Sequence, residues 1–205
     1  MAVPYHHQQR ELQDRFDTRR RADQLNARIA KDHIDAKDRA FIESRDMFFI
    51  ATVDHRGVPT CSYKGGDPGF VRVLRPDHLC FPLYDGNGMF LTAGNLARHP
   101  DVGLLFIAFD RPKRLRLHGE ARLVENAELL ASYPGAQAVV TVRVTEVFAN
   151  CSRYVHRYER RERSGSVPDA DGKPRAWTAA RQRARARILT AAAFLVGRTL
   201  GRYTR

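Results

Sequence analysis

The stretch from Met47 to Phe109 reads MFFIATVDHRGVPTCSYKGGDPGFVRVLRPDHLCFPLYDGNGMFLTAGNLARHPDVGLLFIAF, and it decides the fold of the 205-residue chain. Short apolar runs rich in Val, Ile, Phe and Tyr alternate with turn signals around Gly57, Gly66 and Gly86. Runs of this length at this regular spacing are typical of antiparallel strands in a sandwich or barrel. The stretch therefore predicts a β-sheet, around which the rest of the chain is arranged.

The period of the apolar residues and the turn residues between them set the expected strand boundaries. Pro59 suits the beginning of a strand or an edge strand, and the apolar run 102–109 is typical of a central strand. In the last strand, alternation places Val140, Val142, Val144 and Phe148 on one face. The sequence thus predicts a mainly β fold, a barrel of about six or seven antiparallel strands with flanking helices, with strands at 47–53, 58–64, 70–75, 78–83, 102–109, 113–124 and 138–148.

Helical patterns flank this sheet and interrupt it once. Residues 9–31 are polar and place Leu12, Phe16, Leu25 and Ile29 roughly on one face, which predicts a helical arm packed on the sheet or on a partner chain. Asp35 is a plausible N-cap for a helix at 36–45. Shorter helices are expected at 88–98 and 125–132. The predicted units are an N-terminal arm (1–46), the barrel (47–159), and a linker with a basic C-terminal helix (160–205).

The chain carries a net charge of +12 with a pI of about 10.2, which favours anionic partners. Much of the excess charge lies near the two ends. For the basic C-terminal helix, a solvated helix packed on a dimer is favoured over contact with nucleic acid or a membrane. Three cysteines without CxxC spacing argue against a disulfide framework or a metal site. No apolar signal region begins the sequence, so a cytoplasmic location is expected.

No common hydrolase, zinc-protease or P-loop motif is present, and two glycine-rich loops remain as candidates for chemistry. One carries Ser62 and Lys64 before Gly65-Gly66. The other carries Asn87-Gly88 and opens the helix that contains Thr92. A hydroxyl, an ammonium and free backbone N–H groups are the donors that a phosphate needs. From the residues alone, an anion site and a pair of ordinary tight turns are equally good interpretations.

Four runs, CSYKGGDPGFVRV, FPLYDGNGMF, NLARHPDVGLLFI and VFANCSRYVHR, resemble the pyridoxamine 5'-phosphate oxidase-like family of FMN-binding split barrels. The resemblance covers about residues 5–159 and is strongest in 45–120. It is closest to a bacterial branch of candidate flavin-binding oxidases rather than to the pathway enzyme. The resemblance implies a split β-barrel and a homodimer with FMN held at the subunit interface.

By position, the resemblance also implies a set of cofactor-binding residues. They belong to the second strand, to the turn that leads into the helix at 88–98, and to the segment after the last strand: Ser62, Tyr63 and Lys64; Tyr84, Asn87, Gly88, Met89 and Thr92; and Arg153. Since FMN carries the redox chemistry, no catalytic side chain is assigned. The implied function is an FMN-dependent oxidoreductase that transfers hydride to or from an unidentified small molecule. The alternatives are a flavin-binding or sequestering protein without turnover, and a deazaflavin-dependent reductase.

Overall fold

The structure, a computed structural model, describes residues 5–173. Seven strands form one antiparallel sheet in the order β2-β1-β5-β6-β7-β4-β3, with β2 and its Pro59 at one edge. The predicted mainly β split barrel of six or seven strands with flanking helices is confirmed, whereas the predicted basic C-terminal helix lies outside the described residues. The strands are β1 (Met47–Val53), β2 (Pro59–Gly65), β3 (Arg72–Arg75), β4 (His78–Tyr84), β5 (Asp101–Ala108), β6 (Lys113–Val124) and β7 (Ala136–Asn150).

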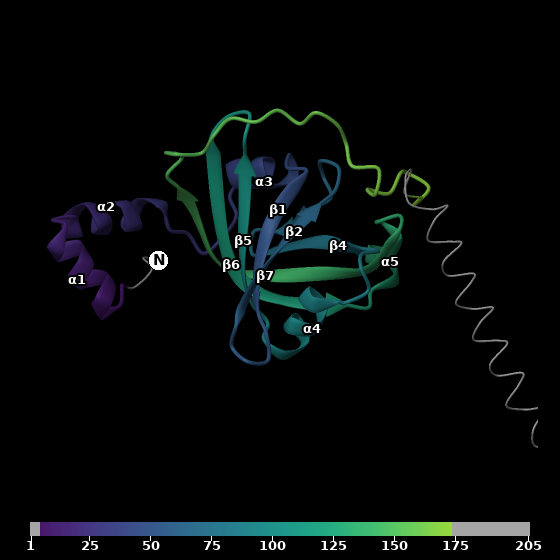
Figure 1. Cartoon of the computed structure of the whole chain (residues 1–205), viewed down its shortest axis with the longest axis horizontal. Coiled ribbons are helices and arrows are strands. Elements are labelled where there is room, and N and C mark those ends of the chain that lie inside the picture. Colours follow the sequence, from purple (N-terminus) through teal and green to yellow (C-terminus); the bar gives the residue numbers. More distant parts are fainter. Residues whose placement is uncertain (1–4, 174–205) are drawn as a thin grey trace, which may run out of the picture.

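The sheet curls around an aromatic core. Strands β1 and β4 are far apart in the strand order, yet the rings of Phe48 and Phe81 lie 5.0 Å apart. Phe48 also contacts Phe106 at 5.2 Å and Phe70 at 5.9 Å between ring centroids. Three of these rings are fully buried, so side chains from strands near the two ends of the sheet meet in the barrel interior. Figure 1 shows the curled sheet that surrounds them.

Strand β7 runs through both halves of the barrel. The first half of β7 pairs with β4, and nearly the whole of β7 pairs with β6. Pairing with β4 ends at Arg143. Beyond it, the same edge of β7 pairs with Lys31, whose backbone exchanges hydrogen bonds of 2.9 and 2.7 Å with that of Val147. The segment before the barrel is therefore attached to β7 at this point.

A bulge in β7 places Phe148 on a different face of the sheet from the one that the sequence predicts. The register passes from His118 opposite Glu146 to Gly119 opposite Val144, which leaves Thr145 as an extra residue. Val144 and Val147 are buried, so Phe148 lies on the outer face instead of sharing the inner face with the valines. The prediction for Phe148 was wrong because strict alternation cannot include an inserted residue.

The helices largely follow the sequence signals. Asp35 caps its helix as predicted, accepting a 2.8 Å hydrogen bond from the Asp38 N–H. The expected helix 9–31 is broken at Asp17, which has φ 50°, and the inserted helix begins at Leu91 rather than Gly88. The helices are α1 (His7–Arg15), α2 (Arg19–Ile29), α3 (Ala36–Glu43), α4 (Leu91–Arg98) and α5 (Ala127–Ala131).

The segment after β7 returns across one end of the barrel (Figure 1). The Tyr158 N–H donates to the Phe109 carbonyl at 3.3 Å, and ion pairs join Arg160 to Asp46 at 2.8 Å and Arg163 to the loop after β2 at 2.7 Å. Residues 151–173 therefore pack back on the barrel. Within residues 5–173, no helix has the length and apolar character that crossing a membrane requires.

Candidate functional site

Alternation along β2 turns Ser62 and Lys64 toward the inside of the sheet. Lys64 pairs with Phe48 and Ser62 with Ile50, and both partners are core residues of β1. Helix α4 covers this edge, so that the Lys64 Nζ donates to the Thr92 Oγ1 at 3.0 Å. The Thr92 hydroxyl in turn contacts the Ser62 Oγ at 3.3 Å. Ser62, Lys64 and Thr92, hereafter the lysine–hydroxyl cluster, thus bring together the two loops that the sequence singled out.

The ammonium of Lys64 is partly removed from water without a compensating carboxylate. Its side chain makes no ion pair within the described part of the chain, and its hydrogen-bond partner is the neutral Thr92 hydroxyl. Burial lowers the pKa of Lys64 below the ordinary lysine value of 10.5. A desolvated cation without a counter-ion favours an incoming anion, because an anion restores the lost charge stabilisation.

A second polar layer fixes α4 on the sheet edge. The Asn95 Nδ2 donates to Thr52 Oγ1 at 2.9 Å and to Thr60 Oγ1 at 3.2 Å, and the two threonine hydroxyls lie 2.9 Å apart. Asn95 follows Thr92 on the helix whose polar groups the sequence suggested for an anion site, whereas Thr52 and Thr60 were not among the predicted residues. The signal was present, since Thr60 precedes Ser62 and Lys64 at the two-residue spacing of one strand face.

The entrance to α4 has an unusual backbone. Phe90 occupies the N-cap position with φ 51° and ψ 28°, and no side chain caps the helix. The first N–H groups of a helix have no partner within it, so they are available to an anion. Before Phe90, Gly88 has φ 80° and the Asn87 Oδ1 accepts from the Met89 N–H at 3.0 Å. Three consecutive apolar residues beside the cluster are largely exposed: Met89 (62%), Phe90 (62%) and Leu91 (58%).

Three predicted residues lie apart from the cluster. Tyr63 points to the opposite, outer face of β2, where its ring packs on Phe49 at 5.9 Å. Tyr84 ends β4, where burial and then Asp67 raise its pKa. Arg153 is exposed, and its backbone N–H donates to the Cys151 Sγ at 3.4 Å. Of the predicted set, the structure joins Ser62, Lys64 and Thr92, with the Asn87–Met89 turn leading into the same helix.

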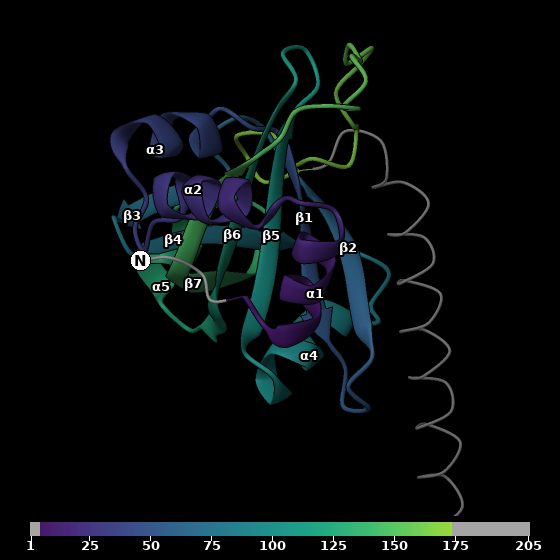
Figure 2. The ribbon, with the colours of Figure 1, turned by 90° about the vertical axis from the view of Figure 1, so that its left-hand side faces the viewer.

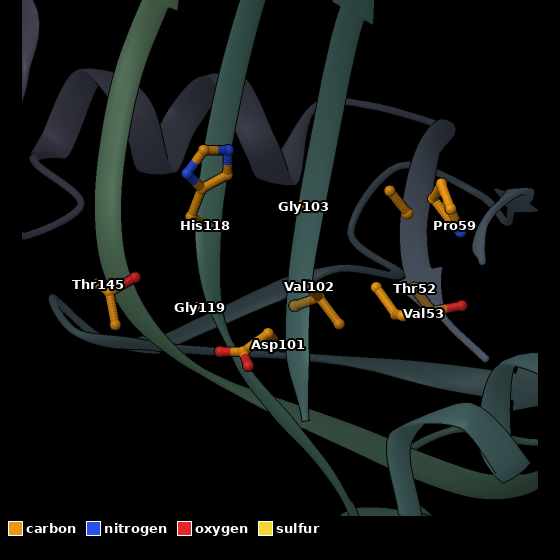
Figure 3. Close-up of a pocket in the computed structure, with 10 residues that line it drawn as sticks. Thr52, Val53, Pro59, Asp101, Val102, Gly103, His118, Gly119 and Thr145 are labelled. Carbon is orange, nitrogen blue, oxygen red and sulfur yellow. The ribbon is translucent and has the colours of Figure 1, made fainter. Parts of the chain in front are cut away.

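A separate hollow of about 360 Å³ lies on the outer face of the sheet (Figure 3). The His118 ring stands on its wall, with Nδ1 3.0 Å from the Glu146 carboxylate and the Phe148 ring at 5.4 Å. Since β2 presents the lysine–hydroxyl cluster on its inner face, the hollow is a different feature. It is lined by Ala51, Thr52, Val53, Pro59, Asp101, Val102, Gly103, His118, Gly119 and Thr145.

Comparison with known proteins gives a family match over residues 34–151, more than half of the chain, described as pyridoxamine 5'-phosphate oxidase. Among solved structures, a candidate pyridoxamine 5'-phosphate oxidase from Lactobacillus delbrueckii is 23% identical, with 58% of this chain and 95% of that chain covered and a TM-score of 0.48. HupZ from Group A Streptococcus is 19% identical, with 62% and 99% covered and a TM-score of 0.48. An FMN-binding protein from Syntrophomonas wolfei is 9% identical, with 71% and 98% covered and a TM-score of 0.46. No curated protein matches the chain.

Proposed function

Because the chain belongs to the pyridoxamine 5'-phosphate oxidase family, we propose that it binds FMN and acts as an FMN-dependent oxidoreductase on a small molecule. The observation that carries this proposal is the lysine–hydroxyl cluster. A half-buried ammonium without a carboxylate partner among residues 5–173, two hydroxyl groups and the uncapped start of α4 are matched to a phosphate dianion. The donor set therefore fits the phosphate end of FMN.

The remaining part of the cofactor has a suitable surface next to the cluster. Met89, Phe90 and Leu91 offer exposed apolar area to a flat ring, and the Asn87–Gly88 turn offers backbone groups to its polar parts. When bound, FMN supplies hydride acceptance and donation. In this account Lys64, Ser62 and Thr92 hold the phosphate, the α4 entrance orients the ring, and Tyr84 borders the loop after β2.

We also propose a homodimer with FMN at the subunit interface. The support for the dimer itself is the outer face of β2, β1 and β5, where Tyr63 is 61% exposed and Phe49, Leu105 and Ile107 are only partly covered. Apolar side chains on a sheet face favour a second protein surface over water. Arg153 follows β7 and is available to the partner subunit or its cofactor in such an assembly.

The test of cofactor binding is an FMN titration of the wild type and of Lys64→Met. Removing a charge-assisted contact to phosphate is expected to weaken FMN about tenfold to a hundredfold, since such contacts contribute about 1.5–3 kcal/mol. Riboflavin, which lacks the phosphate, should lose much less affinity. The matched control is Lys37→Met, which removes an exposed lysine of α3 and should leave the FMN Kd unchanged.

Equal loss of FMN and riboflavin affinity in Lys64→Met would contradict the phosphate assignment. Turnover is a separate question, answered by reduction of bound FMN with NAD(P)H and reoxidation by candidate acceptors. FMN that binds but is never reduced would favour the sequestering protein without turnover. A chain that binds a deazaflavin and excludes FMN would favour the deazaflavin-dependent reductase.

A further inference from the structure

The part of the N-terminal segment that precedes Lys31 (residues 5–30, containing α1 and α2, hereafter the arm) has no core of its own. Neither helix contains a single buried residue, and Leu12, Phe16 and Leu25 are 53%, 66% and 44% exposed. The helices have 9 and 11 residues, and isolated helices shorter than about 12–15 residues are only marginally stable in water. A surface that is not present in the single chain is therefore needed to hold the arm.

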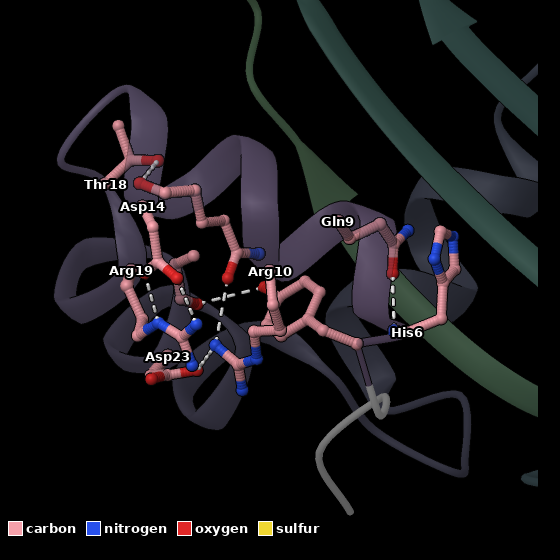
Figure 4. Close-up of polar contacts among 10 residues, drawn as sticks. His6, Gln9, Arg10, Asp14, Thr18, Arg19 and Asp23 are labelled. Carbon is pink, nitrogen blue, oxygen red and sulfur yellow. Dashed lines mark hydrogen bonds and ion pairs between the residues drawn. The ribbon is translucent and has the colours of Figure 1, made fainter.

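Polar contacts nevertheless shape the arm into a defined hairpin (Figure 4). Arg10 pairs with Asp23 at 2.7 Å, and Asp14 pairs with Arg19 across the break between the helices. The Tyr5 hydroxyl donates to the Ala22 carbonyl at 3.1 Å. These contacts join the two helices to each other and not to the barrel. The arm is thus preorganised for binding while its apolar residues stay in solvent.

The barrel of the same chain has an uncovered apolar surface on the side where the arm lies. Phe49, Tyr63, Leu105 and Ile107 share the outer face of β1, β2 and β5, and Tyr63 is 61% exposed. In Figure 1 the arm stands apart from the barrel, and the view from that side in Figure 2 shows it in front of β5 and β6. The arm is attached through Lys31 to β7, which β6 separates from β5 in the sheet.

One contact between opposite charges is also available to the two surfaces, while Arg114 and Arg116 of β6 lie beside Ile107 and Leu105 on the same outer face. Arg20 and Arg21 of the arm are exposed and make no ion pair within residues 5–173. On the outer face, the exposed Asp101 carboxylate lines the hollow and likewise makes no ion pair in that part of the chain. Basic groups on one surface and a carboxylate on the other favour contact between them when both are partly desolvated.

We propose that the arm of one chain packs on the outer face of a second copy, with Leu12, Phe16 and Leu25 covering the partner's β1, β2 and β5. A two-fold arrangement satisfies both chains at once, because each contributes one arm and one receiving face. The inference rests on the homodimer proposed above and assigns to the arm the contact that closes it. The hollow beside His118 is then covered by α2 of the partner's arm, the helix that carries Arg20 and Arg21.

The first test is sedimentation velocity of the variant Leu12→Glu/Phe16→Glu/Leu25→Glu across a concentration series. The dimer dissociation constant should rise by at least about tenfold, since three apolar contacts are replaced by charges. The matched control, Gln8→Glu/Gln24→Glu/Ala27→Glu, adds the same charge at other exposed positions of the same helices and should dimerise like the wild type. Circular dichroism checks that the barrel is intact in both. A triple variant that dimerises as tightly as the wild type, or a wild type that is monomeric throughout, would overturn the proposal.

The second test locates the arm directly. A photoreactive benzoylphenylalanine in place of Phe16 is crosslinked in a mixture of isotope-labelled and unlabelled chains. The expected product joins an arm peptide of one label to a β1, β2 or β5 peptide of the other label. Arm-to-sheet crosslinks within one label only would show that the arm covers its own barrel. FMN binding is measured in the same samples, so a dimer that exchanges arms but binds no FMN contradicts the proposed function alone.

Discussion

Lys64 lies partly buried under the first turn of α4, where its ammonium donates to the Thr92 hydroxyl. Nothing in the sequence near Lys64 announces this burial, because the covering residue is 28 positions away. Alternation along β2 predicts that Ser62 and Lys64 share a face, and the glycines after them predict a turn. Which face α4 covers depends on packing across the sheet, which a single sequence does not encode locally.

The burial of Lys64 predicts a specific pH dependence. The lysine of the free protein loses its proton below the ordinary value of 10.5, so FMN affinity should fall as the pH rises through that lowered pKa. For stability the sign is opposite: in this window the unfolded chain binds more protons, so the stability of the free protein rises with pH. The check is FMN titration between neutral pH and pH 10.5 with Lys64→Arg alongside, since arginine keeps its charge. An alkaline loss of the same size in Lys64→Arg would contradict the assignment.

Alanine substitutions at Gly119 and Gly94 test the close packing at the β7 bulge, with Gly94 as the control position. A Cβ on Gly119 would lie 2.4 Å from the Arg143 carbonyl oxygen, whereas a Cβ on Gly94 of α4 meets no atom within 4 Å. Gly119→Ala is expected to lower the free energy of unfolding by about 2 kcal/mol through overpacking. Gly94→Ala should raise it by about 0.5 kcal/mol through reduced entropy of the unfolded chain. Urea unfolding of both variants is the measurement, and a Gly119→Ala protein as stable as the wild type would argue against the bulge.

The elements themselves were largely accessible from the sequence. Turn residues such as Gly57 and Gly86 mark strand ends correctly, and the strand 113–124 was predicted with the bounds that the structure has. The two incorrect predictions, for the face of Phe148 and for a single helix at 9–31, have local causes. Thr145 inserts into β7 and moves Phe148 to the outer face, and Asp17 turns one expected arm helix into two. Neither residue is a glycine or a proline, so neither gives the usual signal of an irregularity.

The start of α4 combines backbone strain with exposure. A bulky residue at positive φ costs roughly 1 kcal/mol or more, and Phe90 at φ 51° recovers little of that cost by burial, since it is 62% exposed. Strain retained in this way is expected where a side chain serves a ligand. Phe90→Gly is therefore predicted to leave the free protein as stable as the wild type, or up to about 1 kcal/mol more stable, while weakening FMN binding.

Thermal unfolding with and without FMN separates the two effects of Phe90→Gly. The variant should lose part of the FMN-dependent increase in Tm, because ligand stabilisation follows affinity. An undiminished FMN-dependent shift would mean that Phe90 does not contact the cofactor. Leu123→Ala, at an exposed apolar residue near the end of β6, is the control for simple loss of apolar surface.

The single chain leaves apolar surfaces exposed to solvent and one partly buried cation without a counter-ion among the described residues. The arm has no buried residue, the outer face of β1, β2 and β5 carries half-covered apolar side chains, and the lysine–hydroxyl cluster holds a cation without a counter-ion in the described residues. A partner subunit and an anionic cofactor would complete all three. The family match supports the cofactor, and the exposed surfaces support the partner.

Sedimentation velocity of the FMN-loaded protein, followed at a flavin absorption band, measures FMN binding and dimerisation in one experiment. Bound flavin is expected to sediment with a dimer at a ratio of one FMN for each chain, and Lys64→Met is expected to remove flavin from that boundary. A protein that sediments without flavin after loading with excess FMN would contradict the proposed FMN site.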